Sequence, residues 1–152
     1  MPEKRIWLIT GASSGFGAEI ARAALAGGDT VVGTSRSADR LDPLVQAYGD
    51  RFVPLELDVL GAASFEVAEG VVRDIVETHG RLDVLVNNAG RTQVGALEET
   101  TEQELRHLFE LHFFGPAALT RAALPHFRRQ GGGTVVQMSS VGGQVTMPGF
   151  GV

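Results

Sequence analysis

The sequence contains no cysteine and no long apolar run, and both absences narrow what the protein can be. Without cysteine it has no disulfides, no thiolate metal sites and no cysteine nucleophile, and the composition fits a reducing compartment. No apolar run reaches the roughly 18 residues that a membrane span requires. The apolar run at 6–9 is too short for a secretory signal, so we expect a cytoplasmic protein that does not engage a membrane.

Basic residues are also scarce, with 13 Lys and Arg against 18 Asp and Glu and a net charge of −5. This balance argues against a general nucleic-acid surface, although it is compatible with one basic pocket. The four histidines form no His-x-x-x-His pair and have no acidic cluster around them. We interpret His79 as the end of a helix and His107 and His126 as surface residues, so the sequence predicts no metal site.

The 152 residues are 43% hydrophobic and 20% charged, as in one globular domain. Short apolar runs predict strands at 6–10, 30–35, 51–57, 82–86 and 134–138. Amphipathic stretches between them predict helices at 15–26, 38–48, 61–79 and 101–130. In the third helix apolar residues recur at three-to-four spacing and so share one face, namely Phe65, Ala68, Val72, Ile75 and Val76.

Strands that alternate with helices favour right-handed crossovers and a parallel sheet covered on both faces. The run 82–86 is uniformly apolar, which is typical of a strand buried on both sides. No linker or internal repeat divides the chain. We therefore expect one α/β domain over 1–152, with a doubly wound parallel sheet of five strands.

A glycine-rich loop, Thr10–Gly17, joins the first strand to the first helix. Gly11 allows a tight turn, Gly15 lets the backbone approach a phosphate without a Cβ, and Gly17 permits close packing of the helix on the strand. Amides at the helix start would face a pyrophosphate, aided by the helix dipole. In isolation these glycines could form an ordinary loop, but their position favours dinucleotide binding.

Four motifs follow one another in an order that resembles the short-chain dehydrogenase/reductase family. They are Gly-x-x-x-Gly-x-Gly after Thr10, then Leu57–Val59, Asn87–Gly90 and Met138–Gly143. The similarity extends over the whole chain. It implies a Rossmann-type fold that here stops after the fifth strand.

The resemblance also implies which residues contact the cofactor and which residue takes the position of the catalytic serine, Ser140. Leu57–Val59 is similar to the segment that contacts adenine, and Asn87–Gly90 to the segment that steadies the sheet and lines the cofactor site. The implied cofactor contacts are Gly11, Ser13, Ser14, Gly15, Phe16, Gly17, Ser35, Arg36, Leu57, Asp58, Val59, Asn88, Ala89 and Gly90.

The end of the second strand predicts which nicotinamide cofactor is preferred. In dinucleotide sites of this fold an acidic residue there binds the adenine ribose and selects NAD. This chain has Ser35 at that position, followed by Arg36, whose guanidinium could bind a 2′-phosphate. The sequence therefore predicts NADP(H) rather than NAD(H); the alternative is that Arg36 is a solvated loop arginine.

Family chemistry implies hydride transfer between nicotinamide C4 and a carbonyl or alcohol carbon, with Ser140 hydrogen-bonding the substrate oxygen. The alternative role for Ser140 is to cap backbone amides. The family's tyrosine, and the lysine four residues later, would fall just beyond Val152. Because Tyr48 and Lys4 are the only tyrosine and lysine, we expect an incomplete chain without Tyr-x-x-x-Lys and with negligible turnover.

His112 stands where the family usually has an asparagine, whose backbone carbonyl is linked to a proton-relay water at a helix kink. Pro116 has no N–H to donate to the His112 carbonyl, so we expect that carbonyl to remain available. His112 is thus a second candidate for catalysis. The alternative is an imidazole partly packed among Leu108, Phe109 and Phe113.

The leading hypothesis is an NADP-dependent oxidoreductase acting on a small carbonyl or alcohol. Alternatives are a non-catalytic dinucleotide-binding module and, less favoured by the motifs, an epimerase-like relative. The strand at 134–138 would have an open edge. Family members pair through their fourth and fifth helices, so we expect a homodimer or homotetramer in the full-length protein, with apolar contacts from Leu105, Leu108, Phe109, Leu119 and Leu124.

Overall fold

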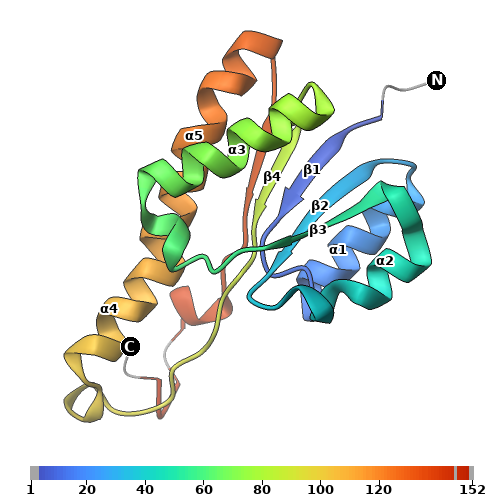
Figure 1. Cartoon of the computed structure of the whole chain (residues 1–152). Coiled ribbons are helices and arrows are strands. Elements are labelled where there is room, and N and C mark those ends of the chain that lie inside the picture. Colours follow the sequence, from blue (N-terminus) through green and yellow to red (C-terminus); the bar gives the residue numbers. More distant parts are fainter. Residues whose placement is uncertain (1–3, 146, 151–152) are drawn as a thin grey trace.

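The computed structural model describes residues 4–145 and 147–150, which form a single parallel sheet flanked by helices (Figure 1). The strand order is β3-β2-β1-β4-β5. The strands are β1 (Ile6–Ile9), β2 (Thr30–Ser35), β3 (Phe52–Glu56), β4 (Val84–Asn87) and β5 (Thr134–Gln137). The α-helices are α1 (Gly15–Ala26), α2 (Asp42–Tyr48), α3 (Phe65–His79), α4 (Glu102–Phe109) and α5 (Gly115–Gln130).

This arrangement confirms the expected Rossmann-type α/β fold. Helices α1 and α2 cover one face of the sheet, and α3 and α5 cover the other (Figure 1). Side chains alternate along each strand, so Leu8 packs toward α3 and α5 while Ile9 packs toward α1 and α2. In β4, Leu85 and Val86 divide in the same way, which explains why that run is apolar throughout. No helix in the described ranges is long and apolar enough to cross a membrane.

The segment 101–130, predicted as one helix, is divided by a π-helical turn, η5 (Glu110–Phe114). The Gly115 amide donates to the Glu110 carbonyl, one residue further back than in an α-helix. Pro116 cannot donate a backbone hydrogen bond, and a Cβ on Gly115 would lie 2.5 Å from Val59 Cγ1. The turn therefore lets α5 lie directly against the segment after β3.

Two residues expected to share the apolar faces behave differently from the prediction. The Phe65 ring is 52% exposed, and the Arg121 guanidinium lies over it at 4.1 Å from the ring centroid. Leu119, expected at a subunit contact, is fully buried against the sheet.

The predicted helices 38–48 and 61–79 begin with separate 3₁₀ turns, η1 (Ala38–Leu41) and η3 (Gly61–Ala63).

The order of the sheet reverses between β1 and β4, and the buried hydroxyl of Thr10 joins the loops that follow these two strands. It accepts hydrogen bonds from the backbone amides of Asn88 at 2.9 Å and Ala89 at 3.0 Å, and donates to the Val86 carbonyl at 3.3 Å. In return, the Asn88 side-chain amide donates to the carbonyls of Thr10 at 2.9 Å and Gly11 at 3.2 Å. The two loops are thus held together.

Gly17 lies where the first turn of α1 meets this joint. A Cβ at this position would be 2.2 Å from the Gly11 carbonyl oxygen and 2.4 Å from Asn88 Nδ2. The helix therefore begins in contact with the loop and the Asn88 side chain, as predicted in general terms from the close packing that Gly17 allows.

Replacing Thr10 with valine should destabilise the fold by about 1–3 kcal/mol, because two loop amides lose their acceptor while the side-chain shape is kept. Thr10→Ser keeps the hydroxyl and removes one methyl group, so its loss should be smaller, about 0.8 kcal/mol. Urea unfolding followed by circular dichroism measures both variants. A Thr10→Val protein as stable as the unmodified chain would show that the hydroxyl contributes nothing beyond packing.

Gly17→Ala should lower the free energy of unfolding by about 1–3 kcal/mol, because its Cβ meets a backbone carbonyl that cannot rotate away. Gly70→Ala in α3 is the matched control, since its Cβ would meet only Arg73 Nη2 at 3.8 Å. That change should raise stability by about 0.5–1 kcal/mol through helix propensity. Calorimetric melting of both variants tests the opposite signs, and a stable Gly17→Ala protein would contradict the contact.

Candidate functional site

A cleft of about 550 Å³ opens at the carboxyl ends of the central strands. Its walls come from the segments at and after the ends of β1, β2, β3 and β4, and from His107 of α4 and Leu111 of η5. It lies where the strand order reverses, the position at which open parallel sheets bind ligands. Its volume is within the range of small-molecule sites.

The glycine loop forms the wall beside α1 and requires glycine at two positions for different reasons. Gly11 has a φ of +68°, and a Cβ there would lie 3.0 Å from Ala89 Cα. Gly15 has a φ of +55°, but its Cβ would meet nothing within 4 Å. The left-handed backbone conformation by itself favours glycine at position 15, and the close approach to a phosphate expected from the sequence stays a prediction.

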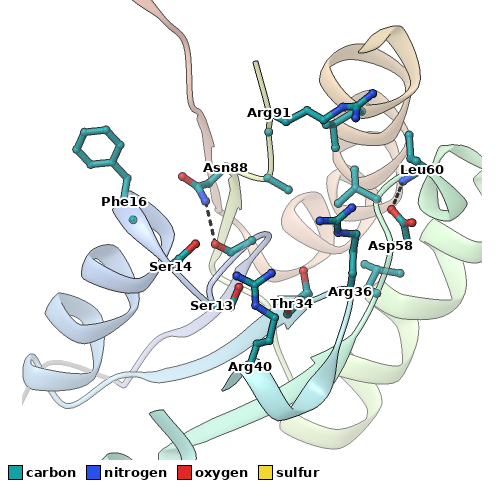
Figure 2. Close-up of a pocket in the computed structure, with 18 of the residues that line it drawn as sticks. Ser13, Ser14, Phe16, Thr34, Arg36, Arg40, Asp58, Leu60, Asn88 and Arg91 are labelled. Carbon is teal, nitrogen blue, oxygen red and sulfur yellow. Dashed lines mark hydrogen bonds between the residues drawn. The ribbon is translucent and has the colours of Figure 1, made fainter. Parts of the chain in front are cut away.

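The start of α1 presents polar groups and no acidic side chain. Ser13 and Ser14 line the cleft (Figure 2), and α1 has no carboxylate in its first turn to offset the positive end of its dipole. Phe16 lies beside them with 75% of its side chain exposed. The start of α1 is therefore suited to bind an anion. The exposed Phe16 ring adds an apolar surface beside that position.

The opposite part of the cleft is basic. Arg36, Arg40 and Arg91 line it, and Asp58 is the one carboxylate among the described lining residues. Ser35 is buried, and its hydroxyl accepts a hydrogen bond from the Ser37 amide at 3.4 Å. The end of β2 thus has a buried serine where other dinucleotide-binding folds have a carboxylate, and the arginine that follows it lines the cleft.

The segments after β3 and β4 complete the cleft. Leu57, Asp58 and Val59 line it, and one Asp58 oxygen accepts a hydrogen bond from the Leu60 amide at 3.1 Å. Asn88, Ala89 and Gly90 line it as well. Because the Asn88 side chain donates to the glycine loop, its amide acts as a structural link between the two walls.

The start of α4 is fixed by a reciprocal cap between Thr101 and Glu104. Glu104 accepts from the Thr101 amide at 2.9 Å, and the Thr101 hydroxyl accepts from the Glu104 amide at 3.2 Å. Hydrogen bonds from the Thr101 amide and hydroxyl hold the pKa of the Glu104 carboxyl below its usual value. The cap orients the helix that brings His107 and Leu111, one turn apart, to the cleft.

The two residues predicted to act in catalysis do not line this cleft. Ser140 is exposed, and its hydroxyl oxygen accepts a hydrogen bond from the Gly142 amide at 3.2 Å, the backbone-capping arrangement considered as its alternative. His112 is also exposed, and its Nε2 donates to the Arg91 carbonyl at 2.9 Å. The His112 ring therefore supports the loop after β4, a contact that the sequence did not predict.

The cleft also contains residues that sequence reasoning missed. Arg40 was a detectable candidate, because it follows Arg36 by four residues on a short helical turn. His107 is exposed as predicted, yet it lines the cleft together with Leu111 at helical spacing. Arg91 follows a recognised motif but carried no signal of its own. Among the described residues, no three His, Asp or Glu side chains gather as metal ligands would.

Comparisons with known proteins agree with this geometry. Oxidoreductase BOA17 of Botryotinia fuckeliana is 38% identical over 147 residues, covering 96% of this chain and 53% of its own length. A short-chain dehydrogenase of Streptomyces avermitilis is 59% identical with a TM-score of 0.90, covering 99% of this chain and 54% of that one. An alcohol dehydrogenase of Thermococcus sibiricus, solved with 5-hydroxy-NADP, is 33% identical with a TM-score of 0.83, covering 98% of this chain and 63% of that one.

The chain therefore spans about half the length of the relatives it matches. The family model described as short chain dehydrogenase matches residues 5–152. That match covers all five strands and all the loops that form the cleft. On this evidence the chain belongs to the short-chain dehydrogenase family of oxidoreductases.

Proposed function

We propose that this chain is the cofactor-binding domain of an NADP(H)-dependent oxidoreductase acting on a carbonyl or an alcohol. The observation that carries the proposal is the end of β2, where Ser35 is buried and Arg36 opens into the cleft. No carboxylate at this position repels a 2′-phosphate, and a guanidinium is available to bind it. The solved relative of Thermococcus sibiricus that holds 5-hydroxy-NADP supports the same preference.

The residues of the cleft fit a nicotinamide dinucleotide. The amides from Gly11 to Gly17 would bind the pyrophosphate at the positive end of α1. Leu57, Asp58 and Val59 would contact adenine, and Asn88, Ala89 and Gly90 would line the ribose side. Ser13, Ser14 and Phe16 line the cleft beside the start of α1. Gly17 would act indirectly, because it allows α1 to pack against Gly11 and Asn88.

Substrate chemistry in this proposal uses the backbone and hydroxyl groups of the chain. A nicotinamide held in the cleft would supply or accept a hydride at C4. Ser140 would donate its hydroxyl hydrogen to the substrate oxygen, while its oxygen continues to accept from the Gly142 amide. The His112 carbonyl, which cannot accept from Pro116, would be free to hold a relay water.

In this proposal, no residue of the described cleft takes the role of the family's catalytic tyrosine or lysine. Tyr48 ends α2, and Lys4 precedes β1. Both groups would instead come from residues beyond 152. We therefore expect the 152-residue chain to bind the dinucleotide and to show negligible turnover with NADPH and carbonyl substrates.

We also propose that the protein is cytoplasmic and that its full-length form is a homodimer or homotetramer. The surface of α4, η5 and α5 carries the exposed side chains of Phe109, Phe113, Phe114 and Leu124. Burying such a patch against a second copy would remove apolar surface from water. The absence of cysteine fits a reducing compartment.

Calorimetric titration of the chain with NADPH and NADH tests the cofactor preference. Arg36→Asp should weaken NADPH binding about 10- to 100-fold, because a charge-assisted hydrogen bond is replaced by like-charge repulsion. NADH affinity should stay the same or rise. Arg22→Asp is the control, since Arg22 pairs with Glu19 on the exposed side of α1. An unchanged preference in Arg36→Asp would defeat the NADP assignment.

His112→Ala should weaken dinucleotide binding about two- to tenfold, because the loop that contains Ala89 and Gly90 loses the hydrogen bond at the Arg91 carbonyl. His112→Asn retains a side-chain donor and should bind more nearly like the unmodified chain. The same titration measures both, with circular dichroism confirming that each is folded. Equal affinities of the alanine and asparagine variants would exclude this supporting role.

A further inference from the structure

Large apolar side chains are exposed on two segments that meet beyond the carboxyl ends of β4 and β5. One segment follows β4, and the other follows β5 and contains Ser140. The Gly95 amide donates to the Gly149 carbonyl at 2.8 Å, and Gly95 forms a parallel bridge with Phe150. Figure 1 shows the end of the chain, in red, passing beside the loop that follows β4. Together the two segments form an apolar surface, made of the exposed side chains of Val94, Leu97, Val141, Val145, Met147 and Phe150.

The members of this apolar surface are open to solvent although their backbones are joined. Val94 is 69% exposed and Val141 is 66% exposed. A Cβ on Gly149 would lie 3.8 Å from Val94 Cγ1, so the Val94 side chain lies against the turn that precedes Phe150. Single exposed apolar residues are common, but a group of them on adjoining segments is typical of a binding surface.

The space around the Ser140 hydroxyl is open as well. Among the described residues, a Cβ on Gly142 would meet only the Ser140 hydroxyl oxygen, at 3.6 Å. A Cβ on Gly143 would meet nothing within 4 Å. A molecule that reached this hydroxyl would therefore meet no bulky side chain of the turn, and it would have Val141 of the apolar surface directly beside it.

The same two segments carry no charged side chain. Residues 92–97 contain none, and Arg129 is the last charged residue before position 152. Two charges close in sequence are directed elsewhere, since Arg91 lines the cofactor cleft and Glu99 accepts a hydrogen bond from the Ala96 amide at 3.3 Å. A phosphate or carboxylate bound at this surface would lose water without gaining a counter-ion, whereas an alkyl or aryl group would be stabilised by leaving water.

We infer that the substrate is a neutral carbonyl compound or alcohol whose apolar chain binds the apolar surface beside Ser140. This inference rests on the proposed function, in which Ser140 binds the substrate oxygen, and it extends that function by naming the substrate class. The oxygen is held at the open hydroxyl, and the alkyl or aryl chain lies toward Val94 and Phe150. Substrates with a charged group on that chain, such as keto acids or sugar phosphates, are disfavoured.

Three ketones test the inference on the 152-residue chain in the presence of excess NADP⁺. They are 2-butanone, 2-octanone and 7-oxooctanoate, which has the length of 2-octanone and a terminal carboxylate. Because each buried CH₂ strengthens binding about fourfold, 2-octanone should bind at least about tenfold more tightly than 2-butanone. The carboxylate should reduce the affinity of 7-oxooctanoate to about that of 2-butanone. Shifts of the valine and methionine methyl resonances during NMR titration measure all three.

Val94→Ser and Phe150→Ser should each weaken 2-octanone binding about three- to tenfold and change 2-butanone binding less than twofold. Ser140→Ala should weaken both neutral ketones alike, because it removes the contact with their common oxygen. Val67→Ser is the matched control, since Val67 is also an exposed valine, at 43%, but lies on α3. It should leave every ketone unchanged, and circular dichroism checks that each variant is folded.

Equal binding of 2-butanone and 2-octanone, or unchanged 2-octanone binding in both Val94→Ser and Phe150→Ser, would overturn the inference. If the chain binds NADPH but shows either of these results, the proposed cofactor function stands and only the substrate class is wrong. If it binds neither NADPH nor NADH, both proposals are wrong. Sedimentation velocity identifies the alternative occupant, a second copy: Val94→Ser with lost self-association and unchanged ketone binding would assign the apolar surface to that contact and contradict the inference.

Discussion

The hydroxyl of Thr10 is the contact on which the site depends, because it is the point where both halves of the sheet meet. It accepts two amides from the loop after β4 while sitting at the end of β1, and the Asn88 side chain returns two hydrogen bonds to the glycine loop. A buried hydroxyl with three partners is well satisfied, and it leaves no freedom for one loop to shift without the other. The walls of the cleft are therefore held at a set separation by polar contacts rather than by apolar packing alone.

Much of the fold could be predicted because its signals are local. The helix at 15–26 and the strand at 30–35 have the predicted bounds, since a glycine loop and a Gly-Gly-Asp sequence mark the ends of that helix. The interruption of 101–130 could not be predicted, because it depends on contact between Gly115 and Val59, which are far apart in the sequence. Phe65 was misassigned because helical spacing reports which residues share a face, whereas only the packed structure shows where that face ends.

The candidate site could likewise be predicted only where its signals are local. Residues in ordered motifs, such as Gly11, Asp58 and Ala89, line the cleft as expected, although their contacts with a cofactor stay predictions. Arg91 and His107 were not predicted as cleft residues, because the cleft brings together segments that nothing in the sequence links. Ser140 and His112 matched family positions, yet each hydrogen-bonds within or beside its own loop and neither lines the cleft. The position of a residue in a motif thus predicts the loop in which it lies better than it predicts the direction of its side chain.

The link between Thr10 and Asn88 spans 78 residues of chain and therefore affects how the protein folds. Closing this long loop costs conformational entropy, and the pairing of β1 with β4 brings the same two segments together, so the cleft requires the paired central strands. An unfolded or partly folded chain lacks this cleft. Any ligand bound there consequently stabilises the docked central strands as a unit, and its free energy of binding is coupled to cooperative unfolding of the whole sheet.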